Sequence, residues 1–74
     1  MKRVIQFNIS KEDGYYTAEG VGVPVVTQEK TLDETVANVH EALSLYFEGE
    51  DLSELGFAPD PSPFINLELE PIHA

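Results

Sequence analysis

Carboxylate side chains are the residues of this sequence best suited to catalysis. Nuclease chemistry of the two-metal type needs several carboxylates that converge on metal ions about 4 Å apart. The candidates are Asp13, in a polar turn, and Glu19, Glu68 and Glu70, which fall on segments with strand-like patterns. Glu68 and Glu70 would share a face at strand spacing. That face is the ordinary solvated side of a half-buried strand, so we predict no metal site and no catalytic residue.

Histidines are the other possible metal ligands or general bases. The sequence has two, His40 and His73. No H-x-x-x-H or H-E-x-x-H pattern accompanies His40. It falls at the margin of an apolar helical stripe, so we expect it on the helix surface or partly packed. His73 falls in the C-terminal tail.

Nucleophilic and phosphate-binding motifs are missing from the sequence. Its serines lack the glycine-framed elbow that exposes a catalytic nucleophile, and there is no cysteine. Gly20-Val21-Gly22 lacks the following helix N-terminus and lysine of a phosphate-binding loop, and it is read as a bend. The sequence therefore predicts a protein that is not an enzyme and needs no cofactor.

An acidic cluster points to binding instead. It reads Glu48-Gly49-Glu50-Asp51-Leu52-Ser53-Glu54, at the expected end of the main helix. Negative charge there opposes the helix dipole by roughly 0.3–1 kcal/mol per charge, so folding alone would favour Lys or Arg. Two interpretations stay open. Glu48, Glu50, Asp51 and Glu54 form a docking surface for a basic partner, or the segment is a solvated loop in which Asp51 caps the following turn.

Charge is unevenly distributed along the chain. The 74 residues contain 14 acids and 4 bases, a net charge of −10, and residues 31–74 contain no Lys or Arg. Such a surface repels phosphate backbones and anionic lipids, so we expect neither direct nucleic-acid binding nor a membrane partner. It attracts basic proteins. The alternative interpretation is that the acidic residues only keep a small protein in solution.

Length and composition indicate one domain spanning residues 1–74. With no cysteine, stability must come from one compact core rather than from disulfides. The N-terminal segment alternates apolar with polar residues, unlike a signal peptide, and no run of about 20 apolar residues could form a membrane helix. We therefore expect a cytoplasmic protein.

Alternating patterns predict four strands. Lys2–Ile9 and Tyr15–Gly20 form a hairpin across a polar turn that ends in Asp13-Gly14. Val23–Gln28 is a third short strand, with Pro24 at its start or on an edge. Pro63–Glu70 alternates again, after an irregular stretch with a possible helical turn around Leu52–Leu55.

One helix separates the third and fourth strands. Thr31 and Glu34 form a capping box, and Gly49 is a plausible C′ residue. An apolar stripe recurs at helical spacing: Leu32, Val36, Val39, Leu43 and Tyr46 or Phe47. The order β-β-β-α-β predicts an α+β two-layer sandwich, an antiparallel sheet covered by one main helix. At least one sheet edge stays open, so we expect a homo-oligomer.

Three segments together resemble the HicB family of antitoxins. Asp13–Glu19, DGYYTAE, is similar to the family's opening hairpin and second strand. Pro24–Thr31 is similar to its turn, short strand and pre-helix threonine, although Val25 and Glu29-Lys30 stand where the family has glycines. Thr31–Leu43, TLDETVANVHEAL, resembles the family's T-L-x-E-A-x-x-N-x-x-E-A-L helix.

The resemblance implies a partial RNase H-like fold without nuclease chemistry. It implies an antitoxin that occludes the catalytic surface of HicA, a small basic toxin that cleaves messenger RNA. Many members continue into a C-terminal DNA-binding domain, whereas this sequence ends after the last strand, so we expect a stand-alone form. The alternative is an orphan homo-oligomeric regulatory or structural protein that has the fold but no toxin partner.

Overall fold

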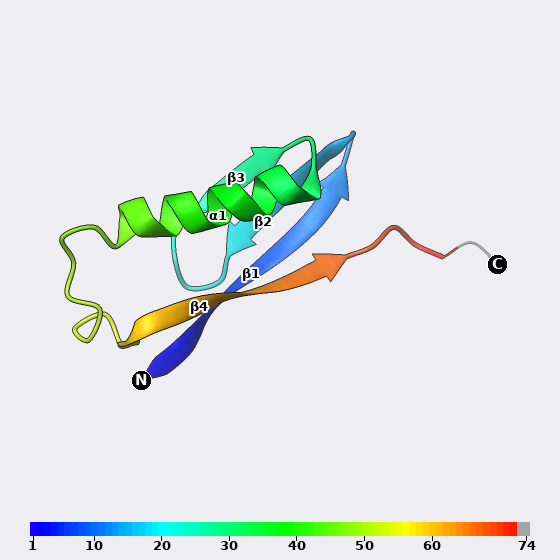
Figure 1. Ribbon diagram of the computed structural model, residues 1–74. Coiled ribbons are helices and arrows are strands. Elements are labelled where there is room, and N and C mark those ends of the chain that lie inside the picture. The colour runs from blue at the N-terminus through cyan, green and yellow to red at the C-terminus, as the bar shows by residue number, and fades with distance from the viewer. Residues whose placement is uncertain (73–74) are drawn as a thin grey trace.

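A four-stranded mixed sheet and one helix make up residues 1–72, the part of the chain that the computed structural model describes. The elements are β1 (Lys2–Glu12), β2 (Tyr15–Gly20), β3 (Val26–Glu29), α1 (Leu32–Tyr46) and β4 (Phe57–Glu68). The strand order is β3-β2-β1-β4, and α1 lies across one face of the sheet (Figure 1). The architecture is therefore α+β, with a sheet layer and a helix layer.

The β1–β2 hairpin has a two-residue turn. Asp13 and Gly14 both have positive φ, at 51° and 81°, and Glu12 pairs with Tyr15. Two such residues match the right-handed twist of the flanking strands, which explains the Asp-Gly signal. The prediction that residues 10–12 belong to the turn is wrong, because so tight a turn leaves them in the ladder.

The third strand is shorter than predicted, and it starts at Val26 instead of Val23. Val23 and Val25 are nevertheless buried, each 7% exposed. The Val25 N–H donates to the Val23 carbonyl over 2.9 Å, and the Val25 carbonyl accepts from the Gly20 N–H over 2.8 Å. These residues form a bend, with φ of +79° at Gly22, that carries two valines into the core. The strand predicted over residues 23–25 is therefore wrong, although both valines belong to the core.

The predicted pairing of Thr31 with Glu34 at the start of α1 is confirmed for the N-cap, although the Glu34 carboxylate bonds the Thr31 hydroxyl rather than the Thr31 N–H of a full capping box. The Glu34 N–H donates to the Thr31 hydroxyl oxygen over 3.1 Å, and that hydroxyl donates to the Glu34 carboxylate over 2.9 Å. The helix ends one turn before the predicted glycine, with Phe47 as its C-cap, and Gly49 lies two residues further on with φ of +76°. Because Glu48 follows the cap in a turn, Gly49 supplies the left-handed conformation after the helix rather than at C′.

The last strand corrects the expectation of an antiparallel sheet, because β4 runs parallel to β1. Since β1–β2 and β2–β3 are antiparallel pairs, β3 runs in the same direction as β1. The helix then returns the chain along the sheet, so the next strand must start from the same end as β3. A strand–helix–strand connection of this kind produces parallel strands.

The fourth strand also begins earlier than predicted, at Phe57 rather than Pro63, and it ends at Glu68. It contains Pro59, Pro61 and Pro63, which the sequence reading placed in irregular chain or at a strand start. Proline is tolerated because β4 is an edge strand, where one side of the backbone needs no ladder partner. A register shift between Lys2 and Val4 accompanies the proline-rich half.

The core lies between the sheet and α1. Ile5, Phe7 and Ile9 of β1 are at most 2% exposed, which confirms the alternation predicted for this strand. From α1, the fully or nearly buried residues are Thr35, Val39 and Leu43. The alternate residues of each strand face away from α1, so the second face of the sheet is open; it carries mainly polar side chains, with Val4 and Phe64 as exposed apolar ones.

Candidate partner-binding surface

The loop that follows α1 is anchored at its base by aromatic side chains. The Phe47 ring lies 5.1 Å from that of Tyr46 and 5.5 Å from that of Phe57, both in edge-to-face contact. At the other end of the loop, the Phe57 N–H donates to the Leu52 carbonyl over 2.9 Å. Leu52 also packs against the core. The acidic residues between these anchors are therefore carried on a loop with a fixed base.

All four residues predicted to bind a partner lie in this loop and are exposed. Glu48 follows the helix cap, and Glu50, Asp51 and Glu54 follow the positive-φ Gly49. The last turn of α1 contains no basic residue. No side chain of that turn therefore offsets the repulsion between these carboxylates and the negative end of the helix dipole. The structure thus places the four acids on one loop at the end of the molecule where α1 ends (Figure 1).

Asp51 differs from the other three, because it caps the turn that follows it. Its carboxylate accepts from the Ser53 hydroxyl over 2.7 Å and from the Ser53 N–H over 3.0 Å. The side-chain bond from Ser53, then the backbone bonds, hold the pKa of Asp51 below its ordinary 3.8. The Leu55 N–H closes the turn on the Leu52 carbonyl over 3.1 Å. The capping role considered from the sequence is confirmed for Asp51, together with the short helical turn.

Two exposed apolar side chains border the acids. Tyr46, just before the C-cap, is 38% exposed, and Leu55, just after Glu54, is 44% exposed. Protein interfaces combine such apolar anchors with a polar or charged rim. We call the set Tyr46, Glu48, Glu50, Glu54 and Leu55 the acidic tip.

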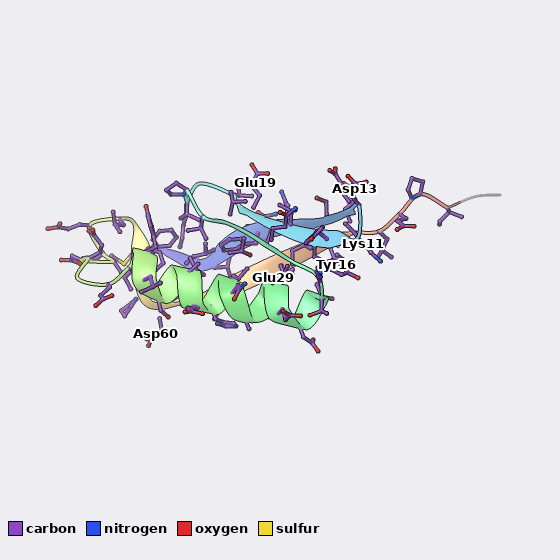
Figure 2. All side chains as sticks on the ribbon, turned by 90° about the horizontal axis from the view of Figure 1, so that it is seen from above. Lys11, Asp13, Tyr16, Glu19, Glu29 and Asp60 are labelled. Carbon is purple, nitrogen blue, oxygen red and sulfur yellow. The ribbon has the colours of Figure 1, made fainter. Side chains whose placement is uncertain are left out.

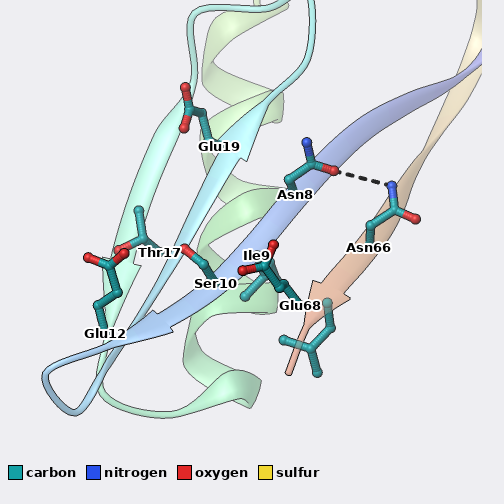
Figure 3. A pocket seen from close by; sticks show the side chains of 9 residues that line it. Asn8, Ile9, Ser10, Glu12, Thr17, Glu19, Asn66 and Glu68 are labelled. Carbon is teal, nitrogen blue, oxygen red and sulfur yellow. Dashed lines mark hydrogen bonds between the residues drawn. The ribbon is translucent and has the colours of Figure 1, made fainter. Parts of the chain in front are cut away.

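The open face of the sheet carries a second polar surface, on the side away from α1 (Figure 2). A depression of about 510 Å³ lies along β1 between its two neighbouring strands (Figure 3). Its polar lining residues are Asn8, Ser10, Glu12, Thr17, Glu19, Asn66 and Glu68. Asn66 donates from its side-chain amide to the Asn8 side-chain oxygen over 3.3 Å.

The carboxylates considered for metal chemistry are dispersed over this face and beyond it. Glu19 of β2 lies opposite Asn8, whereas Glu68 of β4 lies opposite Ser10. Since neighbouring strands are about 4.8 Å apart, the backbones of β2 and β4 are separated by about 10 Å. Asp13 lies in the hairpin turn and Glu70 lies beyond the end of β4. Within residues 1–72, no group of three His, Cys, Asp or Glu side chains could hold a metal ion.

Of the two histidines, His40 lies within the described residues. His40 is exposed on α1, in agreement with a surface placement. It borders a shallow depression together with Phe47 and Asp60. His73 lies outside the described residues.

Sequence reasoning missed the contacts that the strand order creates. The Asn8–Asn66 bond joins residues 58 positions apart, and only the pairing of β1 with β4 brings them together. The Lys11 ammonium lies 5.4 Å from the centre of the Tyr16 ring, and that of Lys30 lies 6.0 Å from the centre of the Tyr15 ring. These lysines therefore lie at the hairpin end of the sheet, on β1 and just before α1. Alternation in the sequence marked the faces of these strands but could not show which strands are neighbours.

The sequence matches no known protein-family model, and no characterised protein or solved structure proved similar enough to serve as a relative. No helix within residues 1–72 has the length and apolar character required to cross a bilayer. The interpretation of the surface therefore depends on its own chemistry.

Proposed function

We propose that this chain is an antitoxin-like binding module that neutralises a small basic RNA-cleaving protein by covering its active surface. The observation that carries the proposal is the acidic tip, where exposed carboxylates and apolar side chains follow the uncompensated end of α1. An RNA-cleaving protein must present positive charge to phosphates. A carboxylate surface competes for that same charge.

The charge distribution supports docking through this end of the chain. Residues 31–74 contain no Lys or Arg, so α1, its loop and β4 present only negative side-chain charge apart from histidine. Opposite charges on two proteins raise the rate of encounter and make association sensitive to salt. Tyr46 and Leu55 would provide the apolar contacts that persist after encounter.

The resemblance to HicB antitoxins supports the same proposal and gives it detail. The observed order β-β-β-α-β is the order that the resemblance implies, and it supports a partial RNase H-like fold. The partner would then be a HicA-type toxin, and the site of action would be the cytoplasm. Binding alone would account for the neutralisation, with no chemistry performed by this chain.

Capture of the partner tests the proposal. The tagged chain is incubated with lysate of its source organism at low salt, and the retained proteins are identified by mass spectrometry. We expect a short basic protein that is lost at high salt. The recovered protein should cleave RNA alone and stop cleaving when the chain is added in equal amount.

A matched pair of double variants tests the surface. Glu50→Lys with Glu54→Lys changes the net charge from −10 to −6, and so does Glu12→Lys with Glu19→Lys on the open face. We expect the first pair to abolish capture and the second to weaken it only slightly. Asp51 is left unchanged because it caps a turn. Equal loss in both variants would show that overall charge, not the acidic tip, governs binding.

The alternative of a homo-oligomeric protein without a toxin partner has one observation in its favour. The edge strand β4 has no neighbour on its outer side within residues 1–72. Recovery of this chain alone in the capture experiment would favour that alternative.

A further inference from the structure

The outer edge of β4 presents free backbone groups whose positions follow from the pairing of β1. The Val21 N–H donates to the Gln6 carbonyl over 2.8 Å, so Gln6 directs its peptide groups toward the β2 side of β1. Peptide groups alternate between the two sides of a strand. The odd-numbered residues of β1 therefore face β4: Ile5, Phe7 and Ile9.

The parallel register then decides which residues of β4 face outward. A residue in a parallel pair bonds to the two residues that flank its Cα partner, so the partner itself points away. The Cα partners of Ile5, Phe7 and Ile9 are Pro63, Ile65 and Leu67. These three residues direct their peptide groups to the outer side of β4. The presence of proline at position 63 agrees with this assignment, because a residue that points away from β1 needs no N–H to bond to it.

Proline divides this outer edge into two unequal parts. Pro59, Pro61 and Pro63 occupy alternate positions in the first half of β4. Proline on an edge removes donors and discourages pairing with another strand. The second half of β4, residues 64–68, contains no proline, and Ile65 and Leu67 there offer both N–H and C=O groups.

Apolar side chains are concentrated around the proline-free part. Phe64 is 54% exposed and Leu67 is 39% exposed. Just beyond the strand, Leu69 is 76% exposed. The opposite edge of the sheet is less suitable, because β3 has only four residues.

We propose that two copies of this chain pair through residues 64–68 of β4, antiparallel and centred on Asn66, to form one continuous eight-stranded sheet. Ile65 of each copy would exchange backbone bonds with Leu67 of the other. The Pro63 carbonyl would accept from the Leu69 N–H of the second copy. Asn66 would face Asn66 of the second copy as a non-hydrogen-bonded backbone pair, in which side chains approach most closely.

The positions of the carboxylates favour this register over its neighbours. With Asn66 at the centre, Glu68 lies opposite Phe64 and Glu70 lies opposite Ser62, so no carboxylate directly faces another. Centring the pair on Ile65 would instead set Asp60 opposite Glu70, and like charges directly opposite are destabilising. Centring on Leu67 would shift more of the pairing beyond the end of β4 at Glu68 than centring on Asn66, which takes only the Leu69 N–H from there as a bonding group.

The amide of Asn66 is already oriented for this pairing. Its nitrogen is directed toward Asn8, and its oxygen points away from Asn8 (Figure 3). The oxygen can accept from the Asn66 amide of the second copy, and the second N–H of each amide can donate in return. A row of four asparagines, Asn8–Asn66–Asn66–Asn8, would then cross the centre of the open face and fix the register.

Self-association is independent of the proposed toxin binding, and its salt dependence has the opposite sign. Each copy has a net charge of −10, so repulsion opposes the dimer at low salt and screening favours it. We expect the fraction of dimer to rise with protein concentration and with salt. Binding to a basic partner should fall with salt, so the two proposals can fail separately.

Sedimentation equilibrium of the purified full chain provides the test, with two matched pairs of variants. Leu67→Pro removes the outward N–H and leaves the ladder to β1 intact, whereas Leu67→Ala keeps that N–H. Asn66→Asp places two carboxylates at the twofold axis, whereas Asn8→Asp adds the same charge one strand away. Circular dichroism melts confirm that each variant is folded.

We expect dimers for the wild type, Leu67→Ala and Asn8→Asp, and monomers for Leu67→Pro and Asn66→Asp. A wild type that stays monomeric at every protein and salt concentration would overturn the proposal. So would a Leu67→Pro variant that is folded and dimerises as the wild type does, because the contact would then lie elsewhere.

Discussion

Asn66 of β4 donates to Asn8 of β1 through their side-chain amides, over 3.3 Å, on the face of the sheet that α1 leaves open. The two residues are also Cα partners in the parallel β1–β4 ladder. The bond therefore reports both the strand order and the register of the sheet. It also places a polar, uncharged pair in a depression whose charged lining residues are all carboxylates, Glu12, Glu19 and Glu68.

Two threonines should respond in opposite directions to replacement by valine. The Thr27 hydroxyl is buried and has no hydrogen-bond partner among the described residues, whereas the Thr35 hydroxyl donates to the Thr31 carbonyl over 2.8 Å. A buried polar group without a partner costs about 1–3 kcal/mol. We expect Thr27→Val to raise the free energy of unfolding and Thr35→Val to lower it by about 1 kcal/mol. Urea denaturation measures both, and a loss of stability in Thr27→Val would contradict the assignment.

Removal of the N-cap of α1 should destabilise the protein. Thr31→Ala deletes the acceptor for the Glu34 N–H and should lower the free energy of unfolding by about 1 kcal/mol. Thr31→Ser keeps the hydroxyl and serves as the control, with a change of a few tenths of a kcal/mol at most. If urea denaturation showed equal losses for both variants, the hydroxyl would not be the source of the effect.

Asp51 should contribute a pH-dependent part of the stability. Because hydrogen bonds from Ser53 lower its pKa in the folded state, the ionised carboxylate favours folding. The contribution is fully present above the ordinary value of 3.8 and is lost as the pH falls through the lower folded pKa. We expect Asp51→Asn to melt at a lower temperature than the wild type at neutral pH. The two melting temperatures should converge well below pH 3.8. A constant difference across this range would show that ionisation of Asp51 does not contribute to stability.

Gly20 should not tolerate a side chain. A Cβ at this position would lie 2.5 Å from the Val23 side chain and 2.8 Å from the Val23 carbonyl oxygen. Relief of that contact requires a shift of the bend that buries Val23, so we expect Gly20→Ala to cost about 1–3 kcal/mol. Val21→Ala, at a neighbouring position that is 50% exposed, is the control and should change stability by less than about 0.5 kcal/mol. Thermal melts of both variants would decide the matter.

Local patterns predicted the helix and the hairpin well because their signals are contained within a few residues. The Thr31–Glu34 pairing and the Asp13-Gly14 turn each depend on neighbours within four positions. The buried alternation of Ile5, Phe7 and Ile9 is local in the same sense. These features fixed the element order, and with it the two-layer α+β class.

The direction and start of β4 could not be obtained in the same way. Whether Pro59 lies in a strand depends on whether that strand is at an edge, which is a property of the whole sheet. For the candidate site, the sequence placed Glu48, Glu50, Asp51 and Glu54 together correctly, since they share one loop. It could not foresee the exposed Leu55 beside them or the Asn8–Asn66 contact, because both depend on tertiary packing.

The central claim is that the acidic tip covers the active surface of a basic RNA-cleaving protein. The most direct measurement is RNA cleavage by the captured basic partner, titrated with wild-type chain and with the Glu50→Lys, Glu54→Lys variant. We predict that cleavage stops at one equivalent of wild type and continues in the presence of the variant. Undiminished cleavage by a partner saturated with the wild-type chain would contradict the claim.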